Sequence, residues 1–158
     1  MFILARAMTY GALFVGVLLL YLPSALLSRS GIVRPPAIGA RQILGMALGA
    51  CGAALAVWCV GTFAVVGRGT PAPFDPPRRL IVRGPYRRVR NPMYLGAGFA
   101  LLGAAVFYGS FALLAYAGCF MLAAHLFVIG YEEPALRRRF PSEYDEYRGR
   151  VGRWWPRP

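Results

Sequence analysis

The segment Arg87-Arg88-Val89-Arg90-Asn91-Pro92-Met93-Tyr94 combines the residue types of an anion-binding site. Pro92 suits the first turn of a helix, where free N–H groups and the positive end of the helix dipole attract anions. Arg90 would add a guanidinium group there, and Tyr94 follows one turn later on the same face. The same residues would also suit a helix end that is anchored among lipid headgroups. The segment therefore predicts either an anion site or a lipid anchor.

Two adjacent acids, Glu132 and Glu133, stand at the end of the last apolar stretch. Carboxylates at the C-terminus of a helix repel each other and oppose the helix dipole, so a positive group should offset them. Arg137 or Arg138 could do so from the next helical turn. A cationic ligand with an ammonium group would do so equally, and ribose hydroxyls would also suit the carboxylates. Both explanations stay open at this point.

His125 is the only histidine, and it precedes Glu132 by seven residues, which places both on one helix face. An ionisable residue inside an apolar stretch indicates either a functional group or a histidine bonded to a neighbouring helix. One histidine, with three cysteines that form no CxxC or Cys/His cluster, predicts no metal site. The sequence also contains no glycine-rich nucleotide loop and no candidate nucleophilic triad.

Four apolar stretches must position these residues, at about 8–27, 43–66 and on both sides of Tyr108-Gly109-Ser110 within 93–131. A membrane-spanning helix needs about 20 apolar residues, and runs of this length without alternation exclude a β-barrel. The 158 residues are 58% hydrophobic and 15% charged, which is too apolar for an ordinary soluble domain. We therefore expect an all-α integral membrane protein with about four transmembrane helices. The Gly-Ser break predicts a tight helical hairpin.

The 18 basic residues, all arginine, divide unequally between the two sides that four helices would define. The N-terminus, the second loop and the tail carry fifteen of them, and the first loop carries three. The positive-inside rule places the arginine-rich side, with both termini, in the cytoplasm, in what we expect to be a prokaryotic inner membrane. Because the arginines lie between apolar spans, orientation explains the net charge of +12 better than nucleic-acid binding does.

A linker and a tail lie outside the apolar stretches. Four prolines predict an irregular cytoplasmic linker at residues 67–77. Residues 134–150 predict an amphipathic tail helix that is interrupted at Pro141, and two tryptophans after it suit a membrane–water interface. The apolar face of this helix would consist of Tyr144, Tyr147 and Val151. In the second apolar stretch, the Gly45-xxx-Gly49 spacing predicts close packing against another helix.

An ordered set of motifs carries a resemblance to a known family. It consists of Gly84-Pro85-Tyr86, Arg90-Asn91-Pro92-Met93-Tyr94 and Glu132-Glu133, followed by Leu136, Phe140, Tyr144, Tyr147, Val151, Trp154 and Pro156. In this order, the set resembles the membrane methyltransferases related to isoprenylcysteine carboxyl methyltransferase and phospholipid N-methyltransferase, over about residues 70–158. The resemblance implies a small helical bundle that binds S-adenosylmethionine on its cytoplasmic side. It divides the chain into an N-terminal transmembrane hairpin, residues 1–67, and a methyltransferase-like region, residues 68–158.

The resemblance also implies which residues form the site. The expected catalytic residues are Arg90 and Glu133. The expected cofactor-binding residues are Arg78, Arg79, Leu80, Ile81, Tyr86, Asn91, Pro92, Met93, Tyr94, His125 and Glu132. The cofactor's carboxylate would suit Arg90 or helix N–H groups, its ammonium and ribose hydroxyls a glutamate, and its adenine the tyrosines. Because the sulfonium already activates the methyl group, catalysis would need in-line positioning and desolvation of the acceptor rather than a strong base.

Two positions depart from the family pattern. Asn91 stands where many members have histidine, and asparagine keeps hydrogen bonding but loses proton transfer. Val128 stands where the prenylcysteine branch has an arginine that holds the substrate carboxylate. We therefore expect a lipidic or isoprenoid-type hydrophobic acceptor that enters from the bilayer, rather than a free carboxylate.

Two other functions are compatible with the sequence. Sterol reductases carry a similar Arg-x-Pro-x-Tyr hairpin and tail, and the extra phosphate of NADPH would suit the arginine excess. The glutamate pair suits a cationic cofactor better than it suits NADPH. The third possibility is a non-enzymatic, lipid-binding membrane subunit, in which the linker, the acid pair and the tail are contacts with a partner.

Overall fold

The computed structural model describes residues 15–32, 36–62 and 80–157 of the chain. Within these ranges the protein is helical and forms no strand; one isolated parallel bridge joins Val89 to Gly152. The proline-rich linker, with Arg78 and Arg79, and residues 8–14 of the first apolar stretch lie outside the described residues. The all-α prediction is therefore confirmed for the described part of the chain.

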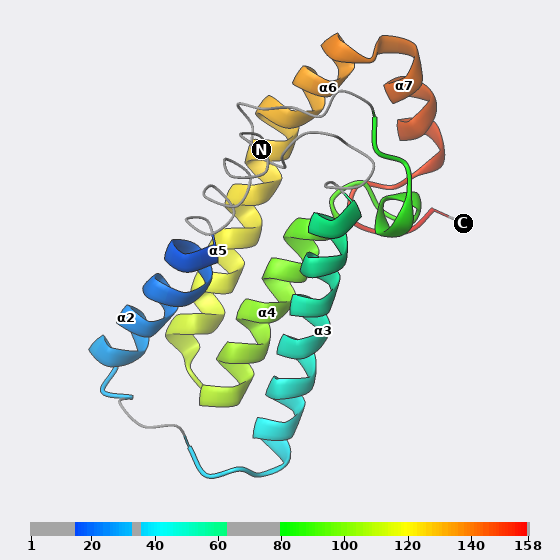
Figure 1. Cartoon of the computed structure of the whole chain (residues 1–158). Coiled ribbons are helices and arrows are strands. Elements are labelled where there is room, and N and C mark those ends of the chain that lie inside the picture. Colours follow the sequence, from blue (N-terminus) through cyan, green and yellow to red (C-terminus); the bar gives the residue numbers. More distant parts are fainter. Residues whose placement is uncertain (1–14, 33–35, 63–79, 158) are drawn as a thin grey trace, which may run out of the picture.

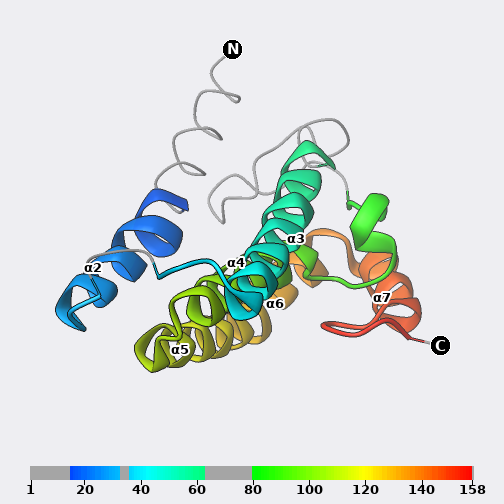
Figure 2. The same cartoon turned by 90° about the horizontal axis from the view of Figure 1, so that it is seen from below.

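The described helices follow one another along the chain as Figure 1 shows. They are the π-helix η1 (Val15–Tyr21), α2 (Leu22–Arg29), α3 (Ala40–Thr62), the 3-10 helix η3 (Gly84–Arg87), α4 (Pro92–Tyr108), α5 (Phe111–Phe127), the π-helix η4 (Val128–Glu132), α6 (Glu133–Arg139) and α7 (Pro141–Arg150). In the bundle, α4 and α5 lie between α3 and α2, as the view from below also shows (Figure 2).

Two helices are long and apolar enough to cross a membrane. They are α3, with 23 residues, and the continuous helix Phe111–Arg139, with 29 residues, which joins α5, η4 and α6. The described apolar helices Gly16–Arg29 and Pro92–Tyr108 are shorter, and the 17 residues of α4 rise only about 25 Å. The structure thus supports two spanning helices, and the expectation of four remains a prediction.

Small residues allow α3 and α4 to pack with their backbones close together. A Cβ atom at Gly45 would lie 2.7 Å from the Gly103 carbonyl oxygen, and one at Gly96 would lie 2.8 Å from the Gly52 carbonyl oxygen. A Cβ atom at Gly103 would likewise meet the backbone of Gly49. Such close approach replaces side-chain packing by backbone contact, as in other small-xxx-small helix pairs. The prediction from Gly45 and Gly49 is confirmed, and its partner is α4.

The turn between α4 and α5 has the form that the sequence predicts. Gly109 ends α4 in the left-handed region, at φ +62°, where glycine carries no steric cost. Ser110 begins α5, and its side chain accepts a hydrogen bond from the N–H group of Leu113 at 3.3 Å. A C-terminal glycine followed directly by an N-cap serine reverses the chain within two residues.

The end of α5 differs from the sequence-based expectation. The sequence indicates that the last apolar stretch ends near Tyr131 and that a separate tail helix begins near Pro134, whereas the structure continues the helix through η4 into α6. A proline inside an α-helix clashes with the carbonyl group four residues earlier, and the wider π turn before Pro134 relieves that clash. Hydropathy and proline position do not reveal a π turn, so the sequence alone does not predict that the helix continues through Pro134.

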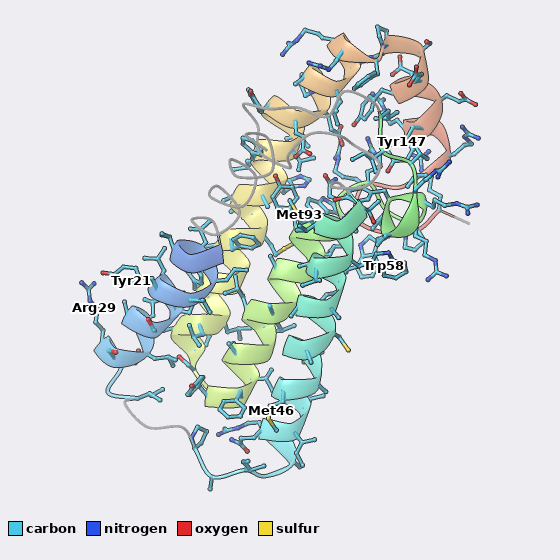
Figure 3. The ribbon with its side chains drawn as sticks, viewed as in Figure 1. Tyr21, Arg29, Met46, Trp58, Met93 and Tyr147 are labelled. Carbon is cyan, nitrogen blue, oxygen red and sulfur yellow. The ribbon has the colours of Figure 1, made fainter. Side chains whose placement is uncertain are left out.

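The tail folds back onto the segment that contains Leu80, Val82 and η3. Tyr144, Tyr147 and Val151 form a buried cluster, against which Leu80, Val82, Leu136 and Phe140 pack. The Tyr147 hydroxyl donates a hydrogen bond to the Tyr86 carbonyl oxygen at 2.6 Å. Figure 3 shows Tyr147 on the side of α7 that faces η3 and the segment before it. The apolar face predicted on the tail is thus covered by protein.

Replacing Gly103 by alanine should destabilise the bundle, because the new Cβ atom would meet the backbone of Gly49 and neither backbone can move aside. We expect a loss of about 1–3 kcal/mol in the free energy of unfolding. Thermal unfolding in a mild detergent measures the effect. Gly118→Ala in α5 is the matched control, since a Cβ atom there would meet nothing within 4 Å. Equal transition temperatures for the two variants would contradict the proposed role of the glycine contact.

Candidate active site

Arg90 is held in place by the backbone before α4. Gly84 begins the turn of η3 at φ +58°, and the chain then runs beside the tail, where the Arg90 N–H group donates to the Gly152 carbonyl oxygen at 2.9 Å. Pro92 follows as the first residue of α4, as the sequence predicts. The backbone therefore directs the Arg90 side chain into the space between α4, the end of the long helix and the tail.

Arg90 and Glu133 form a buried ion pair. Their Nη1 and Oε1 atoms are 3.0 Å apart, and the two side chains are only 7% and 13% exposed. Arg90 Nη1 also donates to the hydroxyl of Tyr144 at 3.0 Å. The arginine-rich turn and the acid pair, which the sequence analysis selected separately, thus meet in one place.

Arg153 is a second guanidinium partner of Glu133. Its Nε atom lies 2.6 Å from Oε1 and its Nη2 atom 2.9 Å from Oε2, which is a bidentate contact. The sequence had suggested Arg137 or Arg138 as the partner of the acids, but Arg137 pairs with Asp145 at 3.1 Å instead. Since Arg153 lies beyond the tail helix, no local spacing could have identified it.

Glu132 has a different environment from its neighbour. The Tyr94 hydroxyl donates to Glu132 Oε2 at 3.2 Å. Among the described residues, Glu132 forms no ion pair, whereas Glu133 contacts two guanidinium groups. The expectation that Tyr94 lies on the same face as Arg90 fits this arrangement, because each reaches one of the two acids. Glu132 is therefore the acid with capacity for a further cationic or hydrogen-bonding group.

His125 contacts the tail through a tryptophan. The Trp154 Nε1–H group donates to His125 Nδ1 at 3.0 Å, and the two ring centres are 6.1 Å apart. The indole N–H group can only donate, so His125 Nδ1 is the acceptor of this bond. The histidine thus has a hydrogen-bond partner within the protein, but the partner comes from the tail. The sequence placed Trp154 at a membrane interface and did not reveal this bond.

The remaining expected site residues that the structure describes surround these contacts. Asn91 is buried, and its Nδ2 atom donates to the Arg153 carbonyl oxygen at 3.3 Å. Ile81, Tyr86 and Met93 pack in an apolar cluster with Cys59 and Leu55 of α3. Leu80 packs against the tail cluster. The structure therefore brings Arg90, Tyr94, Glu132 and Glu133 together. The apolar residues of the expected site pack instead against α3 and the tail.

The protonation states of the tail residues support a stable network. Burial raises the pKa of Tyr144 and of Tyr147 above that of an exposed tyrosine. Hydrogen bonding to Glu133 raises the pKa of Arg153 further above its already high value. Both tyrosine hydroxyls therefore stay protonated, and Arg153 stays charged, across the range of pH in which proteins are usually studied.

A pocket of about 520 Å³ lies on the other side of the two arginines that bind Glu133. Such a volume falls within the range of small-molecule sites. Four arginines and two tryptophans contribute to its wall: Arg90, Arg148, Arg153, Arg157, Trp154 and Trp155. The two acids do not line it, so the guanidinium groups separate the pocket from the carboxylates.

Replacing Arg153 by glutamine should weaken the fold, because Glu133 would keep only one of its two cationic partners in a buried position. Since Arg153 itself is one-third exposed, we expect a loss of about 1–3 kcal/mol in the free energy of unfolding. Arg150→Gln is the matched control, because its pair with Glu146 is about two-thirds exposed on both sides and should contribute less than about 0.5 kcal/mol. Thermal unfolding of both variants in detergent makes the comparison, and an equal loss in both would show that the buried contact adds nothing.

Comparison with known proteins adds one finding. A family model described as "Phospholipid methyltransferase" matches residues 40–143, which is more than half of the chain and includes Arg90, Tyr94, Glu132 and Glu133. No match was found among curated proteins or among solved structures. The matched region also contains α3, α4 and the long apolar helix that carries the two acids. The chain therefore belongs to the phospholipid methyltransferase family, whose members are membrane methyltransferases related to isoprenylcysteine carboxyl methyltransferase.

Proposed function

We propose that this membrane methyltransferase uses S-adenosylmethionine to methylate a lipidic or isoprenoid-type hydrophobic acceptor. Membership of the family supports the class of reaction. The cofactor and the acceptor are inferred from the contacts around the acid pair and from the apolar surfaces of the helices.

The observation that carries the proposal is the unequal pairing of the two acids. Both carboxylate oxygens of Glu133 are bound by guanidinium groups. Glu132 is held by Tyr94 and, within the described residues, by no cation. Glu132 can therefore bind the ammonium group or the ribose hydroxyls of S-adenosylmethionine. When bound, this cofactor supplies a methyl group that its sulfonium already activates.

Glu132 and Arg90 together suit a ligand that carries one positive and one negative group. Glu132 would bind a cationic group, and Arg90 has a buried Nε atom that finds no partner within the described part of the chain. An unpartnered buried donor is costly, so an acceptor atom of a ligand would be stabilised there. The amino acid part of S-adenosylmethionine carries one ammonium and one carboxylate, which matches this pair of groups.

The family resemblance implies that Arg90 and Glu133 are catalytic, and this role remains a prediction. The contacts support a positioning role for both, because they join the start of α4 to the end of the long helix. Their ion pair would fix the relative positions of Tyr94 and Glu132, which then face the same ligand. With an activated methyl group, such positioning and the exclusion of water are what the reaction requires from the protein.

The surfaces of the helices support an acceptor that comes from the bilayer. Large apolar side chains are exposed on α3, such as Ile43 and Val57, and on α5, such as Leu122 and Leu126. Val128, at the position of an arginine in the prenylcysteine branch, is fully buried. It offers neither charge nor contact to a substrate carboxylate, so a lipid-like acceptor without a free carboxylate fits the site better.

Binding of S-adenosylhomocysteine, the product of the cofactor, tests the assignment of Glu132. Calorimetry with the purified protein in mild detergent should give a binding isotherm, and Glu132→Gln should lose about 2 kcal/mol or more, roughly 30-fold in affinity. Glu146→Gln is the control, because Glu146 is exposed and pairs with Arg150 in α7. NADPH should give no heat under the same conditions. If S-adenosylhomocysteine gives none either, the assignment of the cofactor is wrong.

The acceptor can be identified from its labelled product. Membranes that contain the protein should transfer a labelled methyl group from S-adenosylmethionine to a lipid-extractable compound, and membranes without it should not. Glu132→Gln should reduce this transfer at least as strongly as it reduces binding, whereas Glu146→Gln should not change it. Transfer to water-soluble compounds alone would contradict a hydrophobic acceptor.

A further inference from the structure

The pocket behind Glu133 has the electrostatic character of an anion site. Its wall contains the side chains of four arginines and no acidic residue: Arg90, Arg148, Arg153 and Arg157. Glu133 is the one carboxylate that contacts any of these four within the described residues, and it lies on the far side of Arg90 and Arg153. Four guanidinium groups against one carboxylate leave an excess of positive charge, which an anion entering the pocket would neutralise.

The pocket also offers donors that the protein itself does not use. Arg90 also lines the pocket, whereas its buried Nε atom is the donor proposed above for the cofactor's carboxylate. Arg148 and Arg157 form no ion pair there, although Arg157 Nη1 donates to the Gly149 carbonyl oxygen. Guanidinium groups bind phosphate oxygens through parallel hydrogen bonds, so this arrangement suits a phosphate group.

Two exposed tryptophans place the pocket near a membrane surface. Trp155, which lines the pocket, is 80% exposed, and Trp58 is exposed close to the end of α3 at the same end of the bundle (Figure 3). Tryptophan is enriched at the level of lipid headgroups, where its ring is partly apolar and its N–H group is hydrated. A phosphate that reaches this pocket from the surrounding leaflet would belong to a lipid headgroup.

We propose that the pocket lined by Arg148, Arg157 and the two Glu133-bound arginines, Arg90 and Arg153, binds the phosphate of an anionic phospholipid and thereby fixes the tail to the membrane surface. The pocket is separate from the contact proposed for the cofactor at Glu132, which does not line it. A headgroup with an ammonium group would bring a cation among the arginines without a carboxylate to receive it, so lipids whose headgroup carries no positive charge are preferred. The lipid phosphate and the carboxylate of Glu133 then bind opposite sides of the same arginine pair.

Calorimetry with short-chain lipids tests the proposal on the full chain in neutral detergent, without cofactor. The probes are dihexanoylphosphatidylglycerol, dihexanoylphosphatidylcholine and glycerol 3-phosphate. We expect dihexanoylphosphatidylglycerol to bind, with an affinity that falls as the salt concentration rises. Arg148→Gln combined with Arg157→Gln should weaken this binding by about tenfold or more. Arg138→Gln combined with Arg139→Gln removes the same charge from an exposed part of α6 and should leave it within about twofold.

Three results would overturn the proposal. They are equal loss of affinity in the two double variants, equal binding of the phosphatidylcholine probe, and binding of glycerol 3-phosphate as tightly as of the lipid. The last result would assign the pocket to a soluble phosphate compound. Because Arg157 also bonds to the Gly149 carbonyl oxygen, thermal unfolding checks that the double variant keeps its fold. Arg148→Gln alone repeats the test with that bond intact. None of these measurements depends on S-adenosylmethionine, so they stand apart from the test of the methyltransferase.

Discussion

The Glu133 carboxylate, buried and held by two guanidinium groups, connects the parts of the molecule on which the site depends. Arg90 comes from the start of α4, Glu133 from the beginning of α6 and Arg153 from the tail. Removing three charges from water is costly, and the cost is offset only when all three are in contact and hydrogen-bonded. The three segments therefore stabilise one another only when all are in place, so the site forms together with the fold of this end of the bundle.

The transmembrane part contributes a rigid base for this contact. Glycines bring α3 and α4 to backbone contact, and the Gly109–Ser110 turn sets α5 directly beside α4. With these helices fixed, Tyr94 on α4 and Glu132 on the long helix come within hydrogen-bond distance. The tail then covers the site through the bond from Trp154 to His125 and the packing of Tyr144 and Tyr147. The side-chain contacts of the site thus depend on the backbone contacts between α3 and α4.

Local patterns in the sequence predicted what depends on local structure. The start of α4 at Pro92, the turn at Gly109 and the close packing of α3 follow from residue types at fixed spacing, and all three are confirmed. Arg90, Tyr94 and the acid pair were recognised because their types and helix positions are unusual. Arg153 could not be recognised, since its partner lies 20 residues away in a differently directed segment. The π turn was also not predicted, because one extra residue in a helical turn does not change the hydropathy pattern recognisably.

The length of the helix from Phe111 has a consequence for where chemistry can occur in the bilayer. From Phe111 to Glu132 the helix rises about 33 Å, slightly more than the roughly 30 Å of a hydrocarbon layer. If the Gly109 turn lies at one surface of a bilayer, Glu132 lies just outside the hydrocarbon at the other. The reacting group of an acceptor must then lie at the depth of the ester and headgroup region, while its chains remain among the lipid tails. Membrane thickness, and not only chemical identity, would therefore select which lipids can present that group to the enzyme.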